Sequence, residues 1–185
     1  MNYHNITYPD QNNGDGLRIV LWVAGCEHHC TNCQNQQTWS PQSGIPFDKN
    51  AMNEILNELK KDYISGITFS GGDPLHPKNV QNVLKIVDEI RVSYPTKNIW
   101  LYTGYTWEEI WIKDNIKTGD KVKDMHEKAI KNLRRQVVRM CDVLIDGRYI
   151  DELRDVSLHW RGSSNQRVIN VQETLKQNQI VLWES

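Results

Sequence analysis

The sequence lacks any run of apolar residues long enough to cross a membrane, and its N-terminus lacks the basic-then-apolar order of a signal peptide. It also lacks an excess of charge, with 22 Lys and Arg against 23 Asp and Glu, so nothing draws it generally to nucleic acid. No internal repeat or low-complexity segment is present. We therefore expect a single domain over residues 1–185 that binds neither membranes nor nucleic acid.

Cysteine is scarce, yet three of the four cysteines lie in one short segment, with the spacing C-x3-C-x2-C at Cys26, Cys30 and Cys33. Three thiols cannot all pair with one another, and Cys141 is far away in sequence, so the count argues against disulfides. Clustered free thiols without a secretion signal favour a reducing cytoplasm. The segment directly follows the apolar run at 19–24, and a strand that ends in closely set thiols predicts a metal site.

Two metal sites fit this spacing. One is a structural zinc site completed by His28, His29 or a distant ligand, and the other is an iron–sulfur cube that leaves one iron open. Spacing alone favours the cube only modestly, because zinc sites use similar short spacings. We interpret His28 and His29 as solvated loop residues rather than ligands, and Cys141 as a small buried hydrophobe.

Apolar periodicity predicts strands that alternate with helices. The expected strands are 17–24, 64–69, 99–103 and 143–146, with short tail strands at 168–169 and 180–183. The expected helices are 48–61, capped by Asp48, then one opened by Pro77, one capped by Thr106, and 127–140. Residues 1–16 resemble a polar loop, 25–47 a long functional connection and 113–127 a surface excursion. This alternation predicts an α/β fold with a parallel sheet, and because the units are too few for a closed barrel, an open, partial (β/α) barrel.

Two further motifs stand at the ends of expected strands. Gly71-Gly72-Asp73-Pro74 matches neither the G-x-G-x-x-G nor the Walker phosphate pattern, and alone it could be an ordinary turn. Its glycines would let backbone carbonyls approach a ligand closely. Asp146 ends another strand, at the edge where α/β folds build their sites, although Asp146-Gly147 could equally be a turn.

A longer pattern surrounds the cysteines: Gly14-x-Gly16-x-Arg18, then Trp22-x-x-Gly25-Cys26, Cys30 and Cys33-x-Asn35. It resembles the signature of the radical S-adenosylmethionine (SAM) enzymes that activate glycyl-radical enzymes, and in particular the short activators of the anaerobic (class III) ribonucleotide reductase. Trp22 stands where the pattern has Phe. Asn32 stands where most radical SAM enzymes have an aromatic residue, and this departure fits the short activators.

The resemblance implies a [4Fe–4S] cluster held by Cys26, Cys30 and Cys33, with SAM bound to the open iron through its amino and carboxylate groups. One electron from the reduced cluster then cleaves SAM to methionine and a 5′-deoxyadenosyl radical. The resemblance also implies the partial barrel. It further assigns Gly71, Gly72 and Asp73 to the SAM amino end, backbone around Asn32, Cys33 and Gln34 to the adenine end, Asp146 to a place near SAM, and Ser164, Asn165 and Arg167 to SAM or the partner.

The implied partner is the anaerobic ribonucleoside-triphosphate reductase, which would lose a hydrogen atom from one backbone glycine, and the implied electron donor is flavodoxin-like. An activator of another glycyl-radical enzyme, such as pyruvate formate-lyase, is the alternative within enzymes. Those relatives are longer, and several carry extra ferredoxin-like cysteine clusters that this chain lacks. The alternative from another class is a non-catalytic binding module stabilised by zinc.

Overall fold

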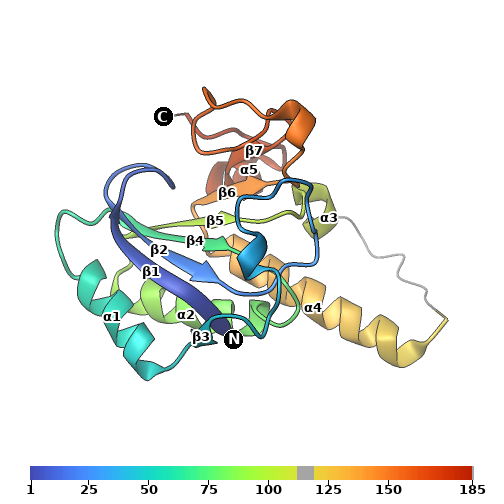
Figure 1. Ribbon diagram of the computed structural model, residues 1–185, viewed down its shortest axis with the longest axis horizontal. Coiled ribbons are helices and arrows are strands. Elements are labelled where there is room, and N and C mark those ends of the chain that lie inside the picture. The colour runs from blue at the N-terminus through green and yellow to red at the C-terminus, as the bar shows by residue number, and fades with distance from the viewer. Residues whose placement is uncertain (112–118, 185) are drawn as a thin grey trace.

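The computed structural model describes residues 1–111 and 119–184, which form a seven-stranded mixed sheet in the order β3-β1-β2-β4-β5-β6-β7 (Figure 1). The strands are β1 Asn2–Asp10, β2 Arg18–Val23, β3 Ile45–Pro46, β4 Gly66–Gly71, β5 Asn98–Tyr102, β6 Val143–Asp146 and β7 Arg167–Asn170. The four central strands β2, β4, β5 and β6 pair in parallel, whereas β1, β3 and β7 pair antiparallel at the two sides. The prediction of an open α/β fold is confirmed, with parallel pairing restricted to the middle of the sheet.

The helices are α1 Lys49–Leu59, α2 Val80–Ser93, α3 Trp107–Trp111, α4 Lys121–Arg139 and α5 Val171–Gln177, with short 3-10 turns η1 Gln36–Thr38 and η2 Asp151–Leu153. Asp48 caps α1 as predicted, because its carboxylate accepts the backbone N–H groups of Asn50 and Ala51. Thr106 caps α3 by accepting the N–H of Glu109 at 3.2 Å. Helices α1, α2 and α4 lie on one side of the sheet (Figure 1).

Alternate residues of the central strands point to opposite sides of the sheet. The helix face, made by Ile19, Leu21, Ile67, Phe69 and Leu101, is fully buried under the helices in the main hydrophobic core. The cavity face is made by Arg18, Thr68, Ser70, Trp100 and Tyr102. This second face is polar and aromatic. The chain that follows β6, called the C-terminal tail below, covers part of it by packing Trp160 and Trp183 against Trp100.

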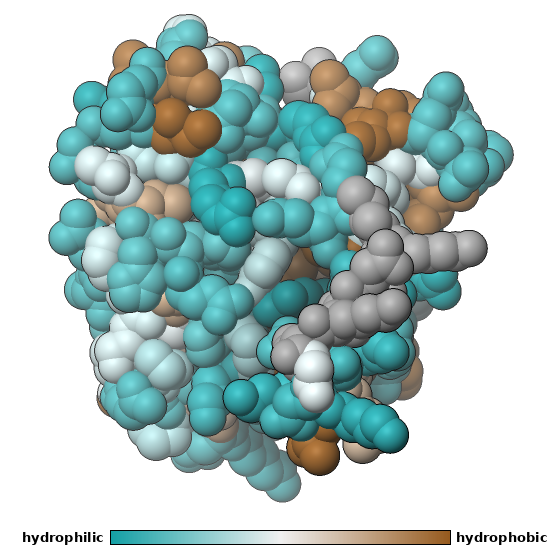
Figure 2. Space-filling model, turned by 90° about the vertical axis from the view of Figure 1, so that its right-hand side faces the viewer, coloured by the Kyte–Doolittle hydropathy of each residue, from teal (hydrophilic) through white to brown (hydrophobic). Residues whose placement is uncertain are grey.

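Two predictions in the first 140 residues are wrong. Residues 2–10 were expected in a loop, but they form strand β1. The polar sequence of this segment gives no strand signal, because β1 is stabilised by its backbone hydrogen bonds to β2. The helix expected from 127 begins at Lys121, where Asp120 accepts the N–H groups of Val122 and Lys123. Residues 121–129 are almost all exposed, so no apolar period marks them; Figure 2 shows this mostly hydrophilic side of the molecule. Residues 113–118 of the expected surface excursion lie outside the described residues.

The C-terminal part also differs from the prediction. Pro77 does not open a helix, because α2 begins only at Val80, after a turn in which the N–H of Asn79 donates to His76 O. Helix α5 was missed, and 180–183 make only an isolated bridge from Leu182 to Ile169 instead of a strand. In the part of the chain that the structure describes, no helix is long and apolar enough to cross a membrane.

Candidate functional site

The cysteine loop, residues 25–39, leaves the carboxyl end of β2 and is tied down at both ends. The N–H of Gly25 donates to Thr38 O at 2.7 Å, and the N–H of Cys26 donates to Trp39 O at 2.9 Å. The buried Asn79 amide, just before α2, donates to Ala24 O at 2.8 Å. These bonds hold the three cysteines at the edge of the parallel strands where α/β folds place their ligands.

Backbone N–H groups act on all three thiols. The N–H of Asn35 donates to Cys33 Sγ at 3.4 Å. Burial has the largest effect on the pKa of Cys26 and Cys30 and raises both, while backbone of His28 and His29 near Cys26, and of Tyr149 near Cys30, acts in the opposite direction. Backbone donors of this kind stabilise cluster sulfurs and tune the cluster potential. Burial raises the pKa of Cys26 to about 12, so a metal must displace its proton. The donor set fits an iron–sulfur cluster.

His28 is not the solvated loop residue that we expected. Its side chain is 4% exposed, and its Nε2 lies 2.7 Å from Asp73 Oδ2. Arg148 Nε donates to His28 Nδ1 at 3.2 Å, so Nδ1 is an acceptor and the ring proton is on Nε2. Gly104 leaves room for the ring, because a Cβ there would lie 2.3 Å from it. The exposed His29, by contrast, lies against Trp39.

The carboxylate of Asp73 is buried, and both of its oxygens accept hydrogen bonds. Besides His28, it accepts the hydroxyl of Thr103 at 2.9 Å and the N–H groups of Gly104 and Leu75 at 3.0 and 2.8 Å. Burial by itself raises the pKa of Asp73, but the hydrogen bond from His28, together with these N–H groups, holds the pKa below its ordinary value. Asp73 therefore joins the cysteine loop to the loop that follows β4.

Gly71 and Gly72 serve a close approach of the same two loops. Gly71 has φ +99°, and a Cβ there would lie 2.8 Å from the backbone of Val23. A Cβ on Gly72 would lie 2.6 Å from Gly25 O. The glycines are thus required by contacts within the protein, and their predicted role at the SAM amino end stays a prediction.

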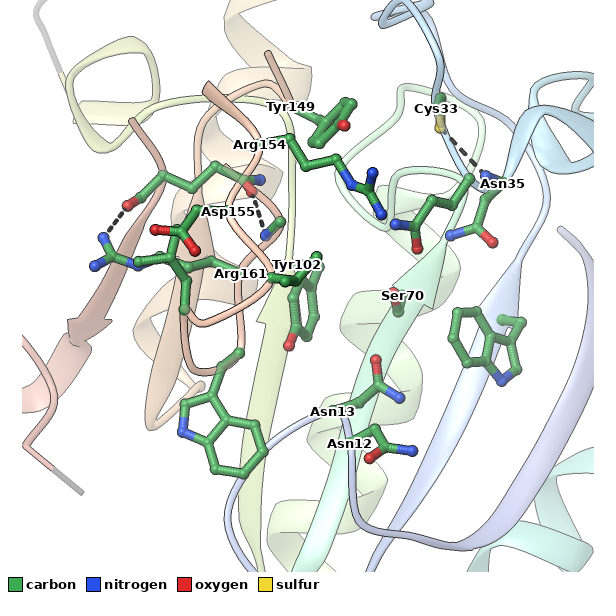
Figure 3. Close-up of a pocket in the computed structure, with 17 residues that line it drawn as sticks. Asn12, Asn13, Cys33, Asn35, Ser70, Tyr102, Tyr149, Arg154, Asp155 and Arg161 are labelled. Atoms are coloured by element: carbon green, nitrogen blue, oxygen red, sulfur yellow. Dashed lines mark hydrogen bonds between the residues drawn. The ribbon is translucent and has the colours of Figure 1, made fainter. Parts of the chain in front are cut away.

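A cavity of about 470 Å³ lies between the cavity face and the C-terminal tail (Figure 3). Strand residues Trp22, Ser70 and Tyr102 line one side. Cys33 and Gln34 bring the cysteine loop to its rim. The remaining lining residues are Asn12, Asn13, Asn35, Tyr149, Arg154, Asp155, Val156, Leu158, Trp160, Arg161, Gly162 and Gln166. The cavity therefore opens beside one of the three candidate cluster ligands.

The backbone of Asn32 is predicted, with that of Cys33 and Gln34, at the adenine end, and this stays a prediction, whereas the side chain of Asn32 contacts the segment after β6. Asn32 adopts φ +54°, and its amide donates to Asp151 Oδ2 at 2.6 Å. Asp151 also accepts the hydroxyl of Tyr149 at 2.6 Å. Asn32 thus fastens the cysteine loop to the segment after β6.

Arg18, the first residue of β2, is completely buried at one end of the cavity face. Its guanidinium donates to Thr68 Oγ1 at 2.8 Å, Asp15 O at 2.7 Å and Ile67 O at 3.0 Å, and lies 5.0 Å from the Trp100 ring centroid. Burial lowers its pKa to about 10, so it remains a cation at neutral pH. The Gly14-x-Gly16-x-Arg18 signature therefore organises this end of the cavity face.

A second cavity, of about 610 Å³, lies on the side of Cys30 and is also lined by Asp146, Asn165 and Arg167. Asp146 is buried and accepts Arg167 Nη2 at 2.5 Å and the N–H of Trp107 at 2.7 Å. The structure thus brings Asp146 and Arg167 together as an ion pair. Ser164 is exposed, and its N–H donates to the tail backbone.

Sequence reasoning missed the residues that shape the cavity. Ser70 and Tyr102 carry a usable signal, because they alternate with apolar neighbours on β4 and β5. Arg154 and Tyr149 carry none, since they lie on an irregular segment whose place depends on tertiary contacts.

A family model described as 4Fe-4S single cluster domain matches residues 12–169. The anaerobic ribonucleoside-triphosphate reductase-activating protein of Escherichia coli K12 is 42% identical over 170 residues, which cover 91% of this chain and 97% of that protein. The proteins of that name from Haemophilus influenzae and from Enterobacteria phage T4 are 41% and 39% identical, over 90% and 91% of this chain and 96% and 93% of theirs. The chain therefore belongs to the family of anaerobic ribonucleoside-triphosphate reductase-activating proteins.

Proposed function

We propose that this protein activates an anaerobic ribonucleoside-triphosphate reductase, as the names of its relatives say of them, by generating a glycyl radical on it. It would act as a radical SAM enzyme with a [4Fe–4S] cluster and SAM. The observation that carries the proposal is the loop of three thiols, in which Cys33 accepts a backbone N–H, beside a cavity on an open α/β sheet. In this proposal residues 1–185 form one domain, a partial barrel of the radical SAM type.

Cys26, Cys30 and Cys33 would ligate three irons of the cluster and leave the fourth iron to SAM. When bound and reduced, the cluster supplies the electron that splits SAM and so starts removal of a hydrogen atom from a partner glycine. The chain's own part is to hold the thiols, orient the substrate and keep water away from the reacting atoms. The backbone N–H groups near the three sulfurs would favour the anionic, metal-bound form of the thiols.

SAM would bind against the cysteine loop, which borders both cavities. Backbone at Gly71, Gly72 and Asp73 is assigned to its amino end, and backbone of Asn32, Cys33 and Gln34 to its adenine end. Because the Asp73 carboxylate is taken up by His28, Thr103 and backbone, its side chain would position the two loops rather than bind the ammonium directly. Asp146, with Arg167, would support the neighbouring cavity, where Asn165 also lies and Ser164 is close in sequence.

The partner's glycine would reach the site on a flexible loop, since an open sheet leaves more room for a protein segment than a closed barrel does. A flavodoxin-like protein would supply the electron, and the three free thiols fit a reducing cytoplasm.

The test is anaerobic purification followed by iron and acid-labile sulfide analysis, and then reaction of the reduced protein with SAM and the reductase. We expect about four irons and four sulfides per chain, and a glycyl-radical doublet in the electron paramagnetic resonance spectrum of the reductase. Deuterium on the α carbon of the partner's glycines should appear in 5′-deoxyadenosine. Near-stoichiometric zinc without sulfide would instead favour a binding module. A doublet on pyruvate formate-lyase and none on the reductase would refute the assigned partner and leave the radical SAM chemistry standing.

A further inference from the structure

The three residues between Cys26 and Cys30, called the spacer below, are held by side chains that are distant in sequence. His28 Nε2 donates to Asp73 Oδ2 at 2.7 Å, and these two side chains are only 4% and 2% exposed. The His28 ring also packs edge-on against Tyr105, with ring centroids 4.5 Å apart. A hydrogen bond to an ionised group, kept away from water, is among the stronger ones in proteins. The loop after β4 therefore holds the middle of the spacer.

Tyr105, three residues after β5, holds the first residue of the same spacer. Its hydroxyl donates to Glu27 Oε1, and burial together with this hydrogen bond raises the pKa of Tyr105, so the phenol keeps the proton that it donates. Arg134, on α4, donates to the Tyr105 hydroxyl oxygen at 2.6 Å, and its guanidinium carbon lies 3.9 Å from the ring centroid. Arg134 Nη2 is also 3.6 Å from Glu27 Oε1, and the Arg134 side chain is 11% exposed. Helix α4 thus reaches the cysteine loop through a nearly buried cation and a nearly buried phenol.

The contacts of Glu27, Tyr105 and Arg134 belong to neither cavity. As residues 1–111 and 119–184 form the two linings, these three side chains lie outside both, so a small molecule bound there would not account for them. Their effect falls on the cysteine loop itself. Ordering a flexible segment costs conformational entropy, and a metal that binds an unordered segment must offset that cost. A spacer that is fixed beforehand removes it.

We propose that His28 and Tyr105 are positioning residues that hold Cys26 and Cys30 in place for the cluster before it is bound, an inference that rests on the proposed function. Each residue fixes the spacer through its own hydrogen bond, and the two rings pack on each other. Loss of either hydrogen bond should loosen the spacer without unfolding the sheet. A looser spacer should retain the cluster less well, because iron leaves only when its thiol ligands move away.

The test compares wild type with His28→Leu, His28→Gln, Tyr105→Phe and a control, Tyr94→Phe. His28→Leu fills a similar volume without a donor for Asp73, whereas His28→Gln offers an amide donor in its place. Tyr105→Phe keeps the ring and removes the hydroxyl. Tyr94 follows α2 and packs against the main core, so Tyr94→Phe makes the same chemical change away from the loop.

Two measurements use the anaerobically reconstituted proteins: the rate at which a chelator removes iron, and the electron paramagnetic resonance spectrum of the reduced cluster. A third uses the metal-free chain, as amide hydrogen exchange of peptides that cover residues 25–39. Urea unfolding of the metal-free proteins reports whether the fold as a whole is kept.

We expect His28→Leu to release iron about tenfold faster than wild type or more, and to change the spectrum of the reduced cluster. His28→Gln should return the rate to within about threefold of wild type, and Tyr105→Phe should fall between His28→Leu and wild type. Tyr94→Phe should match wild type. Exchange over residues 25–39 should rise in the same order in the metal-free chain, while every variant keeps a cooperative urea transition.

Wild-type rates of iron release and of loop exchange in His28→Leu would overturn the inference. So would a His28→Gln variant as impaired as His28→Leu, since the effect would then come from the imidazole ring and not from the bond to Asp73. If wild type takes up zinc without sulfide, the proposed function fails instead. Loop exchange in the metal-free variants then still decides whether His28 and Tyr105 hold the spacer.

Discussion

The two faces of the central sheet are built by alternate residues of the same strands, yet different interactions stabilise them. On the helix face, Leu21 and Phe69 are completely buried among apolar side chains of α1, α2 and α4. On the cavity face, Arg18 and Thr68 are equally buried, but each is held by hydrogen bonds rather than by apolar packing alone. Burial alone therefore does not distinguish a core from a site in this protein; the chemistry of the buried groups does.

Each central strand therefore contributes to stability through one face and to the candidate site through the other. The helix face gains stability from apolar area removed from water and tolerates apolar side chains that fill a similar volume. The cavity face gains less from area, because its polar atoms must each find a partner. It retains Ser70 and Tyr102 beside a space large enough for a small molecule. We expect substitutions on the two faces to separate stability from ligand binding.

The largest effect is expected at the cysteines, which also lie on both sides of this division. Replacing Cys26, Cys30 or Cys33 with Ala should abolish SAM cleavage and reduce bound iron, because two thiolates cannot hold a cube that has an open iron. Cys141 is the matched control, since it is fully buried in the helix-side core and its thiol donates to Val137 O. Cys141→Ala should keep the full iron and sulfide content. Loss of iron from that variant would contradict the ligand assignment.

The next effect concerns the helix face alone. Leu21→Ala should lower the free energy of unfolding by about 2–5 kcal/mol, because it deletes fully buried methyl groups and leaves a void. Urea unfolding of the metal-free protein measures this loss, with Leu21→Met as a control expected to cost less than about 1.5 kcal/mol. At temperatures where the variant stays folded, its affinity for SAM should equal that of wild type. A large loss of affinity would show that the two faces are coupled.

The corresponding change on the cavity face is Arg18→Met. It removes the donor that Asp15 O and Ile67 O share, and we expect it to lower the free energy of unfolding by about 2 kcal/mol. Unlike Leu21→Ala, it should also weaken SAM binding, because Trp100 and the loop before β2 lose the cation that fixes them. Arg18→Lys, which keeps the charge, should fall between wild type and Arg18→Met in both measurements. Unaltered SAM affinity in Arg18→Met would remove the functional distinction between the two faces.

The sequence predicted the helix face better than the cavity face, for a physical reason. Strands β2 and β6 and the Asp48 cap of α1 follow from local patterns, because apolar burial repeats along the chain. Strand β1 and the exposed start of α4 do not, since their stability comes from a neighbouring strand in one case and from a cap without an apolar stripe in the other.

The candidate site, too, could be predicted from the sequence only where the signal is local. The spacing of Cys26, Cys30 and Cys33 is a local signal and could be found in the sequence. The bond between His28 and Asp73 joins residues 45 apart in sequence, and no local pattern announces it. Arg154 has no periodicity around it either, so only the folded chain shows that it points into the cavity. Tertiary contacts of this kind are the part of a site that one sequence cannot supply.

The smallest effect is expected at the rim of the second cavity, which Glu108 and Arg167 line. Arg167 Nη2 donates to Glu108 Oε2 at 2.8 Å, and this hydrogen bond lowers the pKa of the Glu108 carboxyl to about 2. A folded-state pKa below the ordinary value of 4.5 means that the pair stabilises the protein above about pH 4.5, and that this contribution is lost as the pH falls toward 2. Because Glu108 is 46% exposed, solvent screening limits the contribution to less than about 1 kcal/mol. Glu108→Gln should therefore unfold slightly more easily than wild type at pH 7 and match it near pH 2, as measured by urea unfolding of the metal-free proteins. A difference that persists undiminished at pH 2 would mean that Glu108 acts through packing rather than charge, and the rim would then behave like the helix face.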